Sequence, residues 1–85
     1  MGKFAKLYER NGSQVLVKID SDGKGNPEVR FFYEPKDLGV CSMAISFRDD
    51  SPEMWDRAEG IFEKVTQESA FKTVEVALEK VGASL

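Results

Sequence analysis

The sequence contains no histidine and one cysteine, Cys41, among its 85 residues. Histidine is the commonest general base and a common metal ligand. A lone cysteine can neither close an internal disulfide nor build a zinc site with others of its kind. These absences argue against catalysis, so we expect a protein with no enzymatic activity, no cofactor and no bound metal.

The sequence also lacks a long hydrophobic run. Its longest uncharged stretch, residues 38–47, has ten residues, whereas a membrane-spanning helix needs about 20. Lys3, Lys6 and Arg10 interrupt residues 1–10, which therefore lack the apolar core of a signal peptide. We expect a cytoplasmic protein with no membrane partner. A hydrophobic fraction of 41% and a charged fraction of 32% are typical of a globular chain, and the length predicts one domain over residues 1–85.

The first half of the chain alternates apolar and polar residues with a period of two, the pattern of half-buried strands. Asn11-Gly12 is a strong hairpin signal, and residues 20–27 and 35–39 are rich in turn formers. Short turns between consecutive strands favour an antiparallel meander. Residues 1–48 are therefore predicted to form a four-stranded antiparallel sheet, with strands at 3–10, 14–20, 28–34 and 40–48.

The second half changes to helical spacing over residues 51–82. Two starts are possible: Ser51 caps a helix with Pro52 at its first position, or Asp50 caps it with Glu53 three residues later. The apolar phase slips at residues 66–69, which allows one bent helix or two, ending near Gly82. The fold class predicted is α+β, with the helical segment packed on one face of the sheet.

Three motifs have structural explanations. If Asp20 opened a calcium loop, Gly25 would be correctly placed, but Phe31 would stand where a bidentate Glu is required. Cys41 alternates with apolar residues, so we expect it on the buried face as a small hydrophobe. Trp55 has apolar neighbours at helical spacing and is expected in the core.

Charge is unevenly distributed. Residues 1–48 hold eight basic and six acidic residues, whereas residues 49–85 hold four basic and nine acidic ones. The net charge of −3 thus divides into +2 on the sheet and −5 on the helices. We expect an acidic helical face that could bind a basic partner, formed by Asp56, Glu59, Glu63, Glu75 and Glu79.

A second candidate surface is the sheet face opposite the helices, where aromatic and apolar side chains stand among basic ones. Such a surface suits an extended anionic ligand or another protein. The register of the first strand remains open, because a slip of one residue would move Lys6 and Tyr8 to the core side. The predicted members of this face are Lys6, Tyr8, Arg10, Leu16, Lys18, Arg30, Phe32 and Arg48.

The predicted order of four strands and a helix, with an aromatic and basic sheet face, resembles a known family over residues 18–65, and one stretch shows the clearest similarity. Ala44-Ile45-Ser46-Phe47, followed by Ser51-Pro52-Glu53-Met54-Trp55, is similar to the last strand and Pro-Glu-x-Trp helix start of the positive cofactor four family. That resemblance implies single-stranded DNA binding by the sheet of a symmetric dimer whose helices pack together. The chain departs from the family in its acidity and in the extra segment 67–82. Its small acidic style also resembles phage and prophage accessory proteins.

Two hypotheses follow. The first is a non-enzymatic binding protein of the phage accessory type, which acts through protein–protein contact or as a homodimer. The alternative is a single-stranded nucleic-acid binder, in which Tyr8 and Phe32 stack on bases. Under that alternative, phosphates would be neutralised by Lys6, Arg10, Lys18, Arg30 and Arg48.

Overall fold

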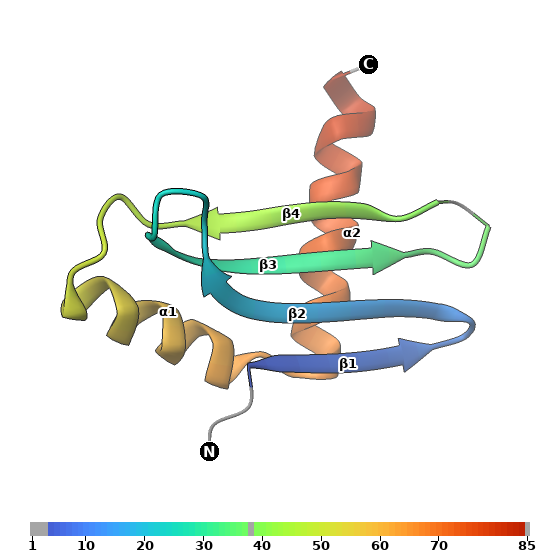
Figure 1. Cartoon of the computed structure of the whole chain (residues 1–85). Helices are drawn as coiled ribbons and strands as arrows, with labels where there is room; N and C mark the ends of the chain where they lie inside the picture. The colour runs from blue at the N-terminus through green and yellow to red at the C-terminus, as the bar shows by residue number, and fades with distance from the viewer. Residues whose placement is uncertain (1–3, 38, 85) are drawn as a thin grey trace.

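A computed structural model describes residues 4–37 and 39–84. Within them, four strands precede two helices: β1 (Ala5–Arg10), β2 (Ser13–Ser21), β3 (Pro27–Glu34), β4 (Cys41–Ser46), α1 (Pro52–Lys64) and α2 (Gln67–Ser84). The strands form one antiparallel sheet in the order β1-β2-β3-β4, and both helices pack on the same face of it (Figure 1). The α+β meander predicted from the sequence is confirmed. Lys3, predicted to begin the first strand, lies outside the described residues.

Turn residues explain where the strands end. Asn11 and Gly12 both have positive φ, 52° and 85°, as a two-residue hairpin turn requires. Between β2 and β3, the Asp22 carboxylate accepts hydrogen bonds from the backbone N–H groups of Lys24 and Asn26 at 2.7 and 3.0 Å. This arrangement is an Asx turn, as expected for a structural rather than a calcium-binding loop.

The helical segment consists of two helices. Ser51 caps α1, since its Oγ accepts a hydrogen bond from the Met54 N–H at 3.3 Å. The chain becomes extended at Val65, and Thr66 and Ser69 then exchange hydrogen bonds across the start of α2. The Ser51 start and the two-helix alternative are therefore correct, although α2 continues past Gly82 to Ser84.

The core lies between the two central strands and the helices. Its β2 and β3 members alternate along each strand, and α1 and α2 supply the opposite wall. Trp55 and Cys41 are only partly buried but pack against this core. The buried hydrophobic residues are Val15, Val17, Ile19, Val29, Phe31, Tyr33, Ala58, Phe62, Ala70, Phe71 and Val74. Neither helix, among the described residues, is long and apolar enough to span a membrane.

Candidate binding surface

The register of β1 decides which side chains reach each face of the sheet. Lys6 lies opposite Val17 and Tyr8 opposite Val15, and directly paired residues of an antiparallel sheet share a face. Because Val15 and Val17 are fully buried under the helices, Lys6, Tyr8 and Arg10 lie on the helix side. Their predicted position on the opposite face is wrong by one residue of register.

Lys6 binds the carboxyl end of α1. Its Nζ donates to the carbonyl oxygens of Phe62 at 2.7 Å, Glu63 at 3.2 Å and Val65 at 3.2 Å, and lies 4.8 Å from the centre of the Phe62 ring. The last carbonyls of a helix have no partner within it and carry partial negative charge. The Lys6 ammonium therefore caps the carboxyl end of α1.

Tyr8 and Arg10 continue this structural role along β1. The Tyr8 hydroxyl donates to the Val65 carbonyl at 3.1 Å. The Arg10 guanidinium lies 4.2 Å from the centre of the Phe71 ring and pairs with Glu75 at 3.1 Å. Side chains of this kind cover apolar surface with their stems while their polar ends reach solvent or carbonyl oxygens. Side chains of β1 therefore contact both helices and stabilise their packing on the sheet.

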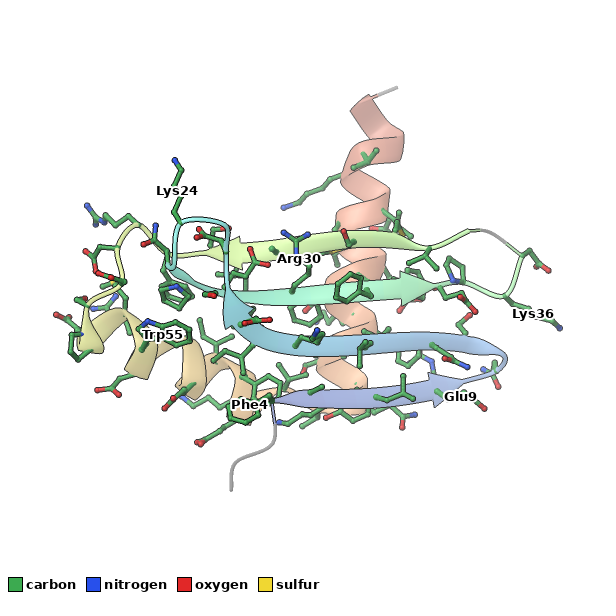
Figure 2. All side chains as sticks on the ribbon, in the orientation of Figure 1. Phe4, Glu9, Lys24, Arg30, Lys36 and Trp55 are labelled. Atoms are coloured by element: carbon green, nitrogen blue, oxygen red, sulfur yellow. The ribbon has the colours of Figure 1, made fainter. Side chains whose placement is uncertain are left out.

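The face away from the helices, here called the open face, is organised in rows that run across the strands. An apolar row pairs Leu7 with Leu16 and Leu16 with Phe32. The neighbouring basic row pairs Lys18 with Arg30. Acidic residues flank both rows, with Glu9 and Glu34 beyond the apolar row, and Asp20 and Glu28 beyond the basic one. In Figure 2 helix α2 passes behind the strands, and Arg30 stands on the face turned to the reader.

The apolar row extends into a shallow pocket of about 330 Å³, lined by Leu7, Gln14, Leu16, Phe32, Glu34 and Val40. Leu7 and Val40 are 63% and 62% exposed. Neither was among the predicted site residues. The error in the register of β1 exchanged Leu7 with its neighbours, whereas Val40 lies just before β4. The Asn11-Gly12 signal could have found Leu7, since a two-residue turn fixes the register of a hairpin.

The basic row is partly neutralised within the chain. Arg30 donates from Nε to a Glu28 carboxylate oxygen at 2.8 Å and from a terminal nitrogen to Ser42 Oγ at 3.2 Å. The hydrogen bond and charge of Glu28 raise the pKa of Arg30. Arg48 follows the end of β4 and is exposed. The structure thus gathers Leu16, Lys18, Arg30 and Phe32 from the predicted face.

The five predicted acidic residues of the helices are exposed, but they are divided between two helices that run in different directions (Figure 1). Glu59 and Glu63 on α1 line a pocket of about 380 Å³ with Phe4, Lys6 and Trp55. Glu75 on α2 is engaged by Arg10, while Asp56 and Glu79 extend from α1 and α2. The acidic residues therefore occupy several sites rather than one continuous face.

The Cys41 thiol and the possible metal ligands are the remaining chemical groups to be placed. The Cys41 Sγ lies 3.6 Å from the Tyr33 carbonyl oxygen, to which it donates. Within residues 4–37 and 39–84, no group of three or more cysteine and carboxylate side chains gathers as a metal site would require.

No family model, no curated protein and no solved structure matches this chain. The resemblance to the positive cofactor four family therefore stays a prediction from the order of the elements, the sheet face and residues 44–47 and 51–55.

Proposed function

We propose that this protein is a small non-enzymatic binding protein of the phage accessory type, which acts in the cytoplasm through protein–protein contact, including contact with its own copy. The open face is the contact surface for its partner. The observation that carries the proposal is the exposed apolar row of this face. Leu7 and Val40 are more than half exposed beside Leu16 and Phe32.

The composition of the open face favours a protein partner. Protein interfaces combine an apolar, often aromatic, centre with a polar rim. Here Leu7, Leu16 and Phe32 form the centre, and Glu34 and Arg30 stand in adjacent rows. A partner that fits would present an apolar protrusion for the pocket and charges of both signs around it.

The alternative function is the binding of single-stranded nucleic acid. Its support is that Phe32, a base-stacking side chain, stands beside Lys18 and Arg30. Two observations argue against it. Arg30 is paired with Glu28, and the side chains of Lys6, Tyr8 and Arg10 are bound to groups of the helical segment. A fluorescence titration with a short oligonucleotide at low salt tests it, and absence of binding at about 100 μM protein removes it.

The leading proposal is tested by comparative co-purification from the native host. Tagged wild type is compared with Phe32→Glu, which places a charge in the apolar row, and with Val76→Glu, which places the same charge on an exposed residue of α2. We expect one stoichiometric protein to be recovered with wild type and Val76→Glu and lost with Phe32→Glu. Equal recovery with all three proteins, or no recovery with any, would contradict the use of the open face.

A further inference from the structure

The outer edge of β4 is unusual in carrying no charge and no proline. The six residues of β4 are Cys-Ser-Met-Ala-Ile-Ser, and the strand ends the sheet. The other edge strand, β1, carries Lys6, Glu9 and Arg10. Exposed edges are ordinarily protected by charges, proline or bulges because their unpaired N–H and C=O groups can pair with another strand. The edge of β4 is therefore open to pairing.

The end of α2 extends beyond this same edge. Figure 1 shows α2 crossing behind the strands and projecting past β4. Its 18 residues span about 27 Å at 1.5 Å per residue. The outermost strands of a four-stranded sheet lie only about 14 Å apart at 4.8 Å per strand. On α2, Val74 is fully buried, whereas Val81, seven residues later on the same stripe, is 58% exposed.

The face of β4 on the helix side is incompletely covered by the helices of its own chain. Val29 and Phe31 in β3 are 0% and 3% exposed, but Ile45, the β4 partner of Val29, is 41% exposed. Coverage by the helices therefore weakens at β4, where Cys41 and Met43 are only partly buried and Ile45 is exposed. One edge of the molecule thus presents an apolar strand face that the helices cover incompletely and an apolar helix stripe that extends beyond the sheet.

We infer that the occupant of this edge is a second copy of the chain. Two copies related by a twofold axis pair β4 with β4 in antiparallel fashion, which makes one eight-stranded sheet. Each α2 then crosses the seam and places Val81 over the helix side of the partner. Because paired residues must share a face, one residue of β4 stands opposite its own copy. The greatest overlap of this six-residue strand makes it Met43 or Ala44.

Charge complementarity favours this occupant. Near the end of β4, a groove of about 430 Å³ is lined by Phe47, Arg57, Gly60, Ile61 and Lys64, so its apolar floor has a basic rim. The projecting part of α2 carries Glu79 and brings it to the rim of the other copy. The six residues of β4 and the five residues that line the groove, together with the exposed end of α2, form the contact surface of each copy.

Charged substitutions at Ala44 test the inference, because a residue beside the twofold axis meets its own copy at about 4.5–8 Å. Ala44→Lys and Ala44→Glu each place like charges together and should raise the dimer dissociation constant at least about tenfold. An equimolar mixture of the two should recover the dimer, because lysine then faces glutamate. Ala5→Lys and Ala5→Glu are the matched controls, since Ala5 lies on the opposite edge strand, in the same row as Ala44, and is also exposed.

Sedimentation velocity and native mass spectrometry measure the outcome, and circular dichroism checks that each variant is folded. A wild type that is monomeric up to about 1 mM, or Ala44 variants that dimerise like wild type, would overturn the inference. So would loss of the dimer in the Ala5 variants instead. The α2 contribution is tested by Val81→Glu, which should weaken the dimer without lowering the melting temperature of the monomer, with Val76→Glu as its control. This interface uses a surface other than the open face, so its failure leaves the co-purification test of the proposed function unaffected.

Discussion

Replacing Lys6 by methionine tests how β1 holds the helices. The substitution keeps an unbranched side chain that can cover the Phe62 ring, but removes the ammonium that donates to three carbonyl oxygens at the end of α1. The carbonyls of Phe62 and Val65 are in partly buried surroundings, where loss of a charged donor has its largest effect.

The expected magnitude follows from two contributions. A cation at a helix carboxyl end stabilises by about 0.3–1 kcal/mol, and by about 2 kcal/mol in partly buried geometry. A hydrogen bond to a charged group contributes about 1.5–3 kcal/mol. The two overlap, because the same ammonium makes both, so we expect Lys6→Met to lower the free energy of unfolding by about 2 kcal/mol. For a domain of this size that is a decrease in melting temperature of about 8–16 °C.

Urea unfolding followed by circular dichroism measures the change, with Lys18→Met as the control. Lys18 belongs to the same sheet but stands on the open face, and its replacement should change stability by no more than about 0.5 kcal/mol. If Lys6→Met is as mild as Lys18→Met, then Lys6 does not cap α1. If Lys18→Met is the more harmful, the register of β1 is wrong.

Three further predictions concern single side chains. Phe71 is 1% exposed and meets Tyr33 edge-to-face at 6.2 Å, so Phe71→Ala should cost about 3–5 kcal/mol in thermal or urea unfolding; a cost below 1 kcal/mol would contradict its central place in the core. Tyr8→Phe removes only the hydroxyl bonded to the Val65 carbonyl and should cost about 1 kcal/mol by urea unfolding, whereas no change would mean that this hydrogen bond does not form. The Ser51 hydroxyl and backbone N–H donate to the Asp49 carboxylate and lower the pKa of Asp49 below the ordinary 3.8. The ionised Asp49 therefore stabilises the folded protein fully above pH 3.8, and this stabilisation disappears as the pH falls through the folded pKa. An NMR titration midpoint at or above 3.8 would contradict this prediction.

Local signals in the sequence were sufficient for most of the fold. Val15, Val17 and Ile19 recur at every second position because one face of β2 is buried, and Asn11-Gly12 supplies the positive φ angles of its turn. The Ser51-Pro52 start was recognisable because capping depends on neighbouring residues. These features are decided within a few residues, which is why they could be predicted without the tertiary structure.

The candidate surface depended on contacts that the sequence does not display. The Asn11-Gly12 turn fixes the pairing that places Lys6 and Arg10 on the helix side, but tertiary packing decides their partners at the end of α1 and on α2. The projection of α2 beyond β4 depends on the angle at which the helix crosses the strands (Figure 1). That angle arises from packing between distant segments, so the exposure of Val81 and Ile45 was not predictable from their spacing.

Contact between the open face and a protein can be detected by site-specific photocrosslinking in the native host. A photoreactive residue at position 32 lies in the apolar row, and the same residue at position 76 lies on the exposed surface of α2. We expect a discrete protein adduct from position 32 and none from position 76. Absence of an adduct from position 32, or the same adducts from both positions, would contradict this expectation.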